Sequence, residues 1–387
     1  MQHHEVPSLH PSSPRAALAT RLIFFFTGLG MAAWAPLVPF VKARAGLDES
    51  TLGLLLLCLG VGSLAAMPFA GAMARRWGCR RVLLPSALLM AACLPLLAVL
   101  ASLPSLVVTL LLFGAALGAL DCTMNLQAVI VERQQGRPMM SGFHGLFSVG
   151  GLAGAGGISL LMQTGLSPLV SVACLLAVMA ATLLLAAPQL LPYADQSTGA
   201  GFALPRGVVV LIGALCFLVF LTEGAVLDWS AVLLTAVHQV DLGRAGYGYA
   251  AFSAAMIIGR LGGDRLVARI GGLRALVVGA LLASAGLLLA TLAGSSALAL
   301  AGFFLVGAGC SNIVPVLFSA AGRQTAMSAS AAIPAVTAIG YSGILAGPAL
   351  IGFGAHAAGL QSAFVAVAVS LWMVAAGGLV LRRLRVV

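Results

Sequence analysis

Charged residues are scarce in this chain of 387 residues. Asp, Glu, Lys and Arg together make up 8% of it, whereas a soluble domain carries about 25%. Hydrophobic residues make up 61%. So few charges cannot cover a folded surface that is in contact with water, which excludes an ordinary soluble protein. The composition therefore predicts that lipid surrounds most of the chain.

Long polar stretches are also missing, so we expect no soluble domain between the apolar runs. An apolar run of about 20 residues crosses the hydrocarbon core of a bilayer as a helix. The runs are continuous and do not alternate with polar residues, which excludes a transmembrane barrel. Twelve spans are predicted, at about 20–42, 50–74, 83–102, 105–131, 139–163, 167–188, 207–232, 245–263, 273–293, 296–320, 330–354 and 360–381.

Signatures of enzymes and of cofactor sites are absent from the sequence. It has no phosphate-binding P-loop, zinc motif or nucleophile elbow. The seven cysteines are an odd number and have neither disulfide nor zinc spacing. We therefore expect no enzymatic activity, no cofactor and no bound metal.

Basic residues are distributed unevenly along the predicted loops. Sixteen fall on the side of the N-terminus and three, Lys42, Arg44 and Arg244, on the other. This bias predicts that both termini are cytoplasmic. Residues 1–19 lack the features of a signal peptide and are interpreted as a flexible cytoplasmic tail. The net charge of +10 then reflects topology and attraction to anionic lipid, and we expect no nucleic-acid partner.

The sequence contains an internal repeat. "RWGCRR" at residues 76–81 matches "RIGGLR" at residues 269–274, and the same offset of 193 residues relates Gly114 to Gly307. Duplicated bundles of this kind hold a solute at the midplane and work by moving one half against the other. The predicted organisation is a tail at 1–19, an N-terminal six-helix bundle at 20–188, a central cytoplasmic linker at 189–206 and a C-terminal six-helix bundle at 207–387.

These features resemble the major facilitator superfamily along nearly the whole chain. The resemblance implies an all-α membrane protein of twelve transmembrane helices in two pseudo-symmetric six-helix bundles. The family's loop motif, G-x-x-x-D-R/K-x-G-R/K-R/K, is matched after the second span at Gly71, Arg76, Gly78, Arg80 and Arg81, with Arg75 in place of its acid, whereas the second copy keeps an acid, Asp264. The gating loops implied are Gly71, Arg76, Gly78, Arg80 and Arg81 after the second span, and Arg260, Asp264, Arg265, Arg269 and Gly271 at the end of the eighth.

A narrower resemblance concerns the fourth span. "DCTMN", at residues 121–125, is similar to the E-x-x-x-N of the fucose–proton symporter branch of the superfamily. Other stretches, such as "HGLFSVGGLAGAG" in the fifth span, resemble an uncharacterised bacterial inner-membrane offshoot. Fucose permeases also use an acid in the first span, and this chain has none there, so fucose itself is not carried over as the solute.

Asp121 stands in the middle of an apolar span, where it costs about 2.5–3.5 kcal/mol to insert. On a helical wheel Asp121, Asn125 and Glu132 share one face with Gly114, and this face is expected to line a cavity. Because desolvation disfavours the charged carboxylate, Asp121 is predicted to exchange a coupling proton. Asn125 would orient it or bind solute. The alternative is that Asp121 only hydrogen-bonds between helices. Its repeat counterpart is Val314.

Three further intramembrane residues are candidates for function. His144 is either a proton relay or a packing residue against the preceding loop, paired with Glu132. Glu223 is either a second coupling or binding acid or a helix-packing residue, and its neighbour Gly224 predicts a break in the helix there. Trp229 either anchors the helix at the membrane interface or closes over the solute.

Arg260 and Asp264 stand four residues apart, a spacing that allows them to pair. We expect this pair to link the two halves; the alternative is an exposed ion pair worth under about 1 kcal/mol. In the tenth and eleventh spans Asn312 and Tyr341 are predicted to line the solute cavity together with Asn125 and Trp229.

The predicted function is that of a secondary active transporter of the bacterial inner membrane. We expect a monomer that moves a small solute by alternating access, with proton-coupled symport of a sugar-like solute as the first choice. Proton-antiport efflux of drugs or metabolites is the alternative. A non-transporting membrane sensor or assembly factor is the alternative from another class. The expected partners are the solute, protons and the lipid bilayer.

Overall fold

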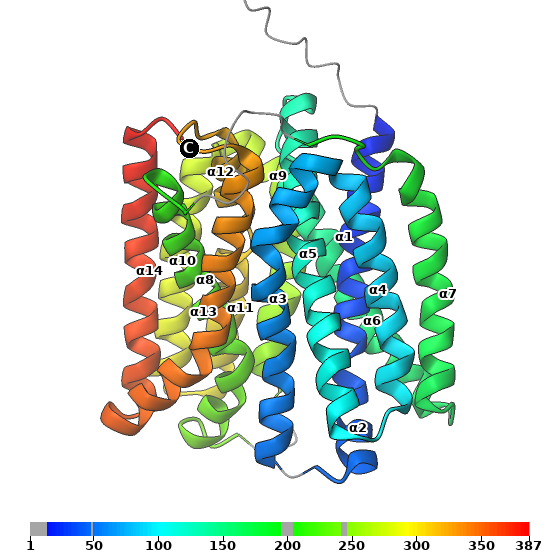
Figure 1. Ribbon diagram of the computed structural model, residues 1–387. Helices are drawn as coiled ribbons and strands as arrows, with labels where there is room; N and C mark the ends of the chain where they lie inside the picture. Colours follow the sequence, from blue (N-terminus) through cyan, green and yellow to red (C-terminus); the bar gives the residue numbers. More distant parts are fainter. Residues whose placement is uncertain (1–13, 48, 195–203, 241–245, 387) are drawn as a thin grey trace, which may run out of the picture.

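The computed structural model describes residues 14–47, 49–194, 204–240 and 246–386, and within these ranges the chain is helical with no strand (Figure 1). The N-terminal helices are α1 (Pro14–Ala33), η1 (Ala35–Leu37), α2 (Val38–Ala45), α3 (Glu49–Trp77), α4 (Cys79–Val99), α5 (Leu103–Gln135), α6 (Met140–Gln163), α7 (Pro168–Ala186) and η2 (Ala187–Gln189). The C-terminal helices are α8 (Val208–Ala236), α9 (Tyr247–Ile270), α10 (Gly272–Leu292), α11 (Ser296–Cys310), α12 (Ile313–Arg323), α13 (Ala329–Ala358) and α14 (Leu360–Arg383).

Eleven helical stretches of the described chain are long and apolar enough to cross a membrane. The twelfth crossing is α9, which has 24 residues and the charged stretch around Arg260 and Asp264. The predicted spans agree with these helices to within a few residues at most ends. Two ends differ more: α1 begins at Pro14, inside the predicted tail, and α9 runs on to Ile270. Both extensions carry charged residues, which a hydropathy pattern excludes from a span.

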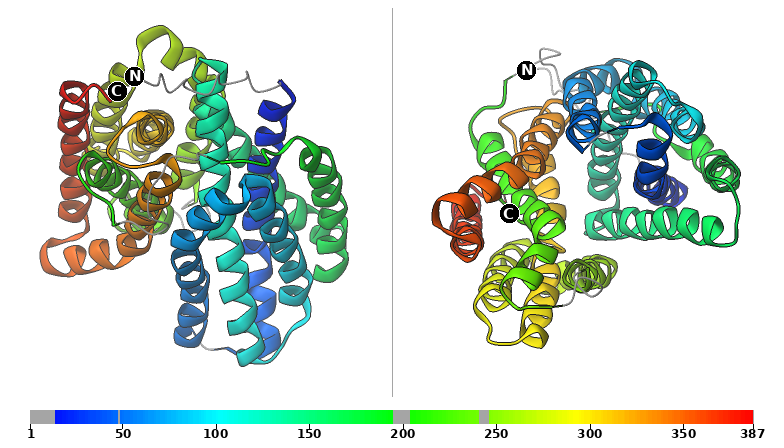
Figure 2. Two further views of the ribbon diagram at one scale, coloured as in Figure 1. Left: turned by 45° about the horizontal axis from the view of Figure 1, so that its top comes forward. Right: turned by 90° about the horizontal axis from the view of Figure 1, so that it is seen from below.

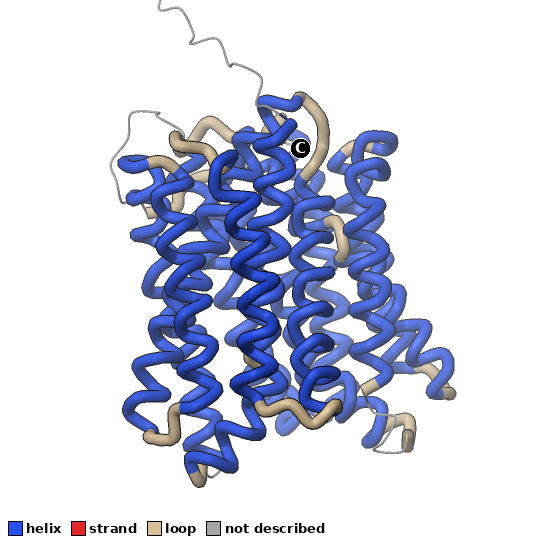
Figure 3. The backbone as a smooth tube through the Cα atoms, turned by 90° about the vertical axis from the view of Figure 1, so that its right-hand side faces the viewer, coloured by secondary structure: helices blue, strands red, loops and turns tan. Residues whose placement is uncertain are grey.

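Short connections join the helices at both ends of the bundle (Figure 3). The loops after α3 and after α9 are single turns at Gly78 and Gly271, whose φ values are 86° and 83°. Only glycine adopts this conformation readily, so these residues allow the chain to reverse between two helices. We call the end of the bundle that holds Arg75, Arg76, Arg80 and Arg81 the arginine-rich end. The C-terminus lies at this end (Figure 1).

The two halves of the chain pack by the same contacts. A Cβ atom at Gly114 of α5 would collide with the carbonyl oxygen of Leu59 on α3. In the other half a Cβ at Gly307 of α11 would collide with the carbonyl oxygen of Phe252 on α9. Leu59 and Phe252 are also 193 residues apart. The repeat therefore extends from sequence to helix packing, and the chain forms two pseudo-symmetric bundles of six membrane-crossing segments.

Two helix pairs dominate the interface between the halves, α3 with α13 and α6 with α9. Seen along the helix axes, the N-terminal and C-terminal groups lie beside one another and meet along these helices (Figure 2). Gly71 of α3 contacts Pro334 and Ser330 at the start of α13. These contacts place the start of α13 at the arginine-rich end.

Two crossings, the seventh and the tenth, show where a helix is continuous and where it is interrupted. The helix predicted to break at Gly224 is continuous, since α8 runs from Val208 to Ala236. Gly224 instead lets α8 approach Ile344 of α13 closely. The tenth crossing is interrupted at Ser311 and Asn312, between α11 and α12. Pro315 explains that position, because it has no N–H to donate to the carbonyl four residues earlier.

Candidate functional site

A chain of polar side chains connects α5 to α6 inside the N-terminal half. Asp121 lies near the middle of α5 and is partly buried, and Asn125 is 1% exposed. The Asn125 Nδ2 donates to the Asp121 carbonyl oxygen at 2.8 Å and lies 3.4 Å from its carboxylate Oδ1. The Asn125 Oδ1 is 3.1 Å from Nε2 of His144. Asp121, Asn125 and His144 therefore form one connected group.

His144 occupies an aromatic pocket between the two halves. Its ring makes an edge contact with Phe24 of α1, at a centroid distance of 5.3 Å, and a tilted contact with Phe318 of α12, at 5.8 Å. The alternative that His144 pairs with Glu132 is wrong. Glu132 Oε2 instead accepts hydrogen bonds from the backbone N–H groups of Met139 and Met140, at 2.8 and 2.9 Å. It thus caps the start of α6, where unpaired N–H groups attract a carboxylate.

A second polar group lies across the interface. Arg260 of α9 donates from Nη1 to Ser148 Oγ on α6 at 3.0 Å, and its Nη2 lies 3.7 Å from Glu223 Oε1 on α8. Ser148 in turn donates to the carbonyl oxygen of His144 at 3.1 Å. Side chains from three helices are joined in this way. Arg260 therefore belongs to the interior of the interface, next to the group that contains Asp121.

The predicted pairing of Arg260 with Asp264 is wrong. In the described chain the ion pair of Arg260 is with Glu223, and Asp264 Oδ2 accepts a hydrogen bond from the backbone N–H of Gly142 at 3.0 Å. The two side chains leave α9 one turn apart and reach different neighbours. Asp264 does connect the two halves, but it does so through the start of α6. Its position, seven residues before Gly271, is that of Gly71 in the first repeat.

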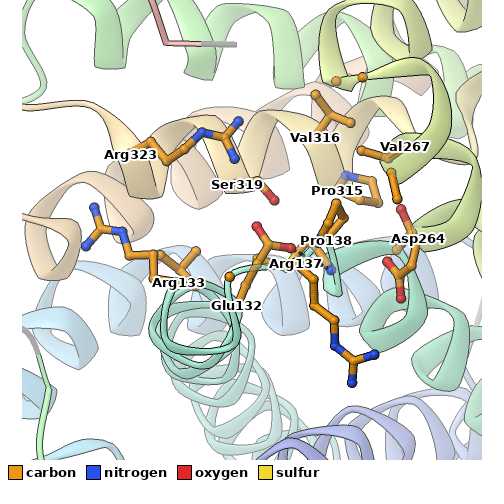
Figure 4. Close-up of a pocket in the computed structure, with 17 residues that line it drawn as sticks. Glu132, Arg133, Arg137, Pro138, Asp264, Val267, Pro315, Val316, Ser319 and Arg323 are labelled. Atoms are coloured by element: carbon orange, nitrogen blue, oxygen red, sulfur yellow. Dashed lines mark hydrogen bonds between the residues drawn. The ribbon is translucent and has the colours of Figure 1, made fainter. Parts of the chain in front are cut away.

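A pocket of about 740 Å³ opens beside this contact at the arginine-rich end. Glu132 and Asp264 line it together with residues of α12, and Arg133, Arg137 and Arg323 surround it (Figure 4). Figure 4 shows Arg133 of α5 to the left of the Glu132 carboxylate and Arg323 of α12 above it. Sequence reasoning did not predict the pocket, because it lies between segments that are far apart in the chain.

The predicted cavity residues Asn312, Trp229 and Tyr341 have packing contacts of their own. Asn312 Nδ2 donates to the Gly259 carbonyl oxygen on α9 at 3.2 Å. A Cβ atom built at Gly352 of α13 would lie 3.4 Å from the Trp229 ring. Tyr341 of α13 packs against a cluster from the other half that contains Cys122, the neighbour of Asp121. Tyr341 thus lies close to the Asp121 group, whereas Trp229 lies further along α8.

The predicted gating loops connect neighbouring segments at the arginine-rich end. The backbone N–H of Arg80, at the start of α4, donates to the Leu191 carbonyl oxygen at 2.8 Å. The beginning of the predicted linker therefore packs onto the N-terminal half. The guanidinium of Arg76 lies over the Trp77 ring at 5.8 Å. The exposed members of the two loops are Arg76, Arg81, Arg265, Arg269 and Gly271. Arg244 lies outside the described residues.

Sequence reasoning missed Ser148 and misplaced the role of Arg260. Ser148 follows His144 by one helical turn, so the spacing was a usable signal once His144 had been selected. Arg260 stands within an apolar stretch, before the charged end of its helix, which also sets it apart from Arg265 and Arg269. In the described chain no three His, Cys, Asp or Glu side chains gather as a metal site would require.

Proteins similar in sequence include an uncharacterised transporter and a membrane protein. Residues 22–342 match the family model described as Major Facilitator Superfamily. An uncharacterised MFS-type transporter of Yersinia pestis is 51% identical over 360 residues, which cover 93% of this chain and 94% of that protein. Membrane protein MosC of Rhizobium meliloti is 34% identical over 362 residues, covering 92% of this chain and 88% of MosC.

Solved structures of low sequence identity share the fold. The fucose:proton symporter FucP of E. coli superposes with a TM-score of 0.77 at 19% identity, covering 95% of this chain and 98% of FucP. The human organic anion transporter MFSD10 gives a TM-score of 0.74 at 16% identity, covering 95% of this chain and 100% of the other. The family match spans most of the chain, and the Yersinia relative is similar over nearly its whole length. The chain therefore belongs to the Major Facilitator Superfamily and is a multi-pass membrane transporter of a small-molecule solute.

Proposed function

We propose that this transporter is a proton-coupled symporter, and that the group of Asp121, Asn125 and His144 carries the coupling proton. The observation on which the proposal rests is the continuous hydrogen-bonded path from the middle of α5 to α6. A carboxylate inside a membrane bundle is costly and marks proton or ion pathways. His144 adds a second titratable group, and Asn125 holds the two in fixed positions.

Alternating access supplies the transport step. The two halves meet through α3 with α13 and through α6 with α9, and rocking about these contacts would expose the centre to one side at a time. The Asp264 contact to Gly142 would hold the arginine-rich end together in one state and release it in the other. We take the rocking units to be residues 20–188 and 207–387, joined by the linker at 189–206.

The orientation follows from the charge distribution. We propose that the arginine-rich end faces the cytoplasm of a bacterial inner membrane, so that both termini are cytoplasmic. We also propose a monomer, because each half finds its partner within the same chain. The bundle surface carries large apolar side chains suited to lipid, for example Leu184 at 74% and Phe353 at 76% exposure.

A sugar-like solute is the first choice. The support is the resemblance of "DCTMN" to the motif of the fucose–proton symporter branch and the shared fold with FucP. Asn125, which belongs to that motif, is already held by Asp121 and His144, so its role is to position Asp121. Solute hydroxyl groups would then bind to side chains that face the centre from both halves, among them Tyr341.

The test uses purified protein in proteoliposomes that contain a pH-sensitive dye. A thermal-shift screen against sugars, sugar acids, amino acids and drugs first selects a solute, because a ligand stabilises the fold that binds it. Solute added outside is expected to acidify the lumen, since symport carries protons inward with it. An alkaline shift would indicate proton antiport and support the efflux alternative.

The variant Asp121→Asn is expected to abolish this proton movement while the protein remains folded. Asp228→Asn is the matched control, because Asp228 lies exposed on α8 and undergoes the same chemical change. If Asp121→Asn moves protons with the solute as the native protein does, the assignment of the coupling group is refuted.

A further inference from the structure

Arg260 is a buried cation whose hydrogen-bonding capacity is only partly used. It is 8% exposed. Nη1 donates to Ser148, whereas Nη2 lies 3.7 Å from Glu223 Oε1, which is too long for a hydrogen bond. Nε is buried and has no hydrogen-bond partner among the described residues. A buried guanidinium in this situation still requires an acceptor.

The N–H groups of Arg260 that lack a hydrogen-bond acceptor lie on one edge of the guanidinium. Nε and Nη2 form the edge on which a carboxylate binds with two parallel N–H···O bonds. Glu223 does not bind in this way, since it approaches Nη2 alone. Its Oε1 is itself buried without a hydrogen-bond partner in the described part of the chain. Both members of the ion pair are therefore incompletely satisfied, as expected if another group takes a place between them.

The geometry points to a ligand carboxylate on this edge. Given the transport function proposed above, we propose that the solute is a small hydroxylated organic acid, and that its carboxylate binds Nε and Nη2 of Arg260 in place of Glu223. Sugar acids combine this anionic group with the hydroxyl groups of a sugar-like solute. Arg260 would thus determine specificity, and Glu223 would hold Arg260 in place between transport cycles.

The charge balance of the site links anion binding to a proton. Two carboxylates against one guanidinium would repel each other, so the anion is expected to bind when Glu223 is protonated. The anion thus binds together with a proton on Glu223, and the net charge of the site does not change. The solute remains an anion throughout, while the proton moves onto Glu223.

Among the described residues, Arg260 is the charged neighbour of Glu223. Within electrostatic range of Glu223 are Cys216 on its own helix and Cys310 on α11, and His144 faces Arg260 from α6. On α13, Tyr341 contacts Phe220 of α8. The charged residues of α12 and α14 lie in their last turns, at Arg323, Arg382 and Arg383.

The experiment measures binding of matched acid and neutral probes by thermal stabilisation at constant ionic strength. D-galacturonate is compared with D-galactose, and D-gluconate with D-sorbitol. The native protein is expected to prefer the acid of each pair, and to bind it more tightly as the pH falls. Arg260→Lys keeps the charge but loses the two-bond edge, so its affinity for the acid should fall about tenfold. Arg382→Gln, at the exposed end of α14, controls for loss of surface charge.

Glu223→Gln provides the second, independent variant. It removes the competing carboxylate with little change of shape, so the acid should bind several-fold more tightly at neutral pH and the pH dependence should disappear. The proposal is overturned if neutral probes bind as well as acids, if Arg260→Lys and Arg382→Gln bind acids equally, or if no acid of the panel stabilises the native protein. Binding does not require coupling, so Asp121→Asn should retain the preference for acids. A neutral solute with intact proton coupling would refute the anion site and leave the proposed symport standing.

Discussion

His144 and Asn125 join α6 to α5 through one buried hydrogen bond, 3.1 Å between Nε2 and Oδ1. The Nδ2 of Asn125 is already directed at Asp121, so Oδ1 is the atom left to accept. This arrangement places the proton of the neutral imidazole on Nε2. The Asn125 amide thus links Asp121 to the start of α6, the helix that contacts α9 in the other half.

The first prediction concerns this hydrogen bond. Asn125→Ala and His144→Ala should each destabilise the protein, and the double variant should lose less than the sum, because both remove the same bond. Buried interhelical hydrogen bonds in membrane proteins couple by about 0.6 kcal/mol and by up to about 1.7 kcal/mol. The measurement is a double-mutant cycle from unfolding in mixed detergent micelles. Strict additivity would contradict a direct bond between the two side chains.

The positions of the crossing helices could be predicted from the sequence because the signal is local. A membrane helix needs its own apolar run, and each run is visible without knowledge of its neighbours. The repeat could be found for the same reason, since "RWGCRR" and "RIGGLR" contain glycines that the backbone requires at the same turn. Asp121 and Asn125 were found because a polar residue in an apolar run is conspicuous.

The partners of these residues could not be predicted, because they depend on rotations and offsets between helices. Spacing along α9 allowed Arg260 to pair with Asp264, but the packing of α9 on α6 and α8 turned the two side chains to different neighbours. The same holds for His144, which lies close to Glu132 in sequence and yet binds Asn125. Gly224 suggested a broken helix, whereas it marks a close approach of α8 to α13.

The second prediction tests the equivalence of the two halves. Gly114→Ala and Gly307→Ala each place a methyl group against a backbone carbonyl of the neighbouring helix. The helices must separate, so each variant should lose about 1–3 kcal/mol of stability. Thermal unfolding in detergent is the measurement.

Gly156→Ala is the control for this comparison. A Cβ at Gly156 of α6 has no atom within contact distance in the described chain. This variant should be neutral or should stabilise α6 by up to about 1 kcal/mol. A Gly307 variant as stable as the Gly156 variant would refute the equivalent packing of the C-terminal half.

The third prediction concerns Arg44, a basic residue at the end opposite the arginine-rich end. Its guanidinium donates to the carbonyl oxygens of Leu97, Ala98 and Leu100, at 2.9, 2.7 and 2.9 Å. These carbonyls end α4 and have no partner within their own helix. Arg44→Lys keeps the charge but cannot reach all three, so it should cost about 1.5–3 kcal/mol in stability. Unchanged thermal unfolding of Arg44→Lys would show that the charge alone matters.

The fourth prediction concerns the contact between Asp264 and Gly142. The Asp264 carboxylate caps the N-terminus of α6 from the other half, and such a charge at a helix end contributes about 0.3–2 kcal/mol. Asp264→Ala removes the acceptor and should favour separation of α6 from α9 at the arginine-rich end. Asp264→Asn keeps an acceptor oxygen without the charge, so its effect should be smaller.

Separation of the two helices would widen the pocket beside Asp264, and this can be measured by alkylation. Ser319 lines the pocket and is partly buried, so a cysteine at Ser319 reports its accessibility. The exposed Cys174 is first replaced by serine to lower the background. The alkylation rate should rise in the order native, Asp264→Asn, Asp264→Ala. Equal rates in all three would mean that the Asp264 contact does not hold the two halves together, and that the close packing of α6 on α9 does so alone.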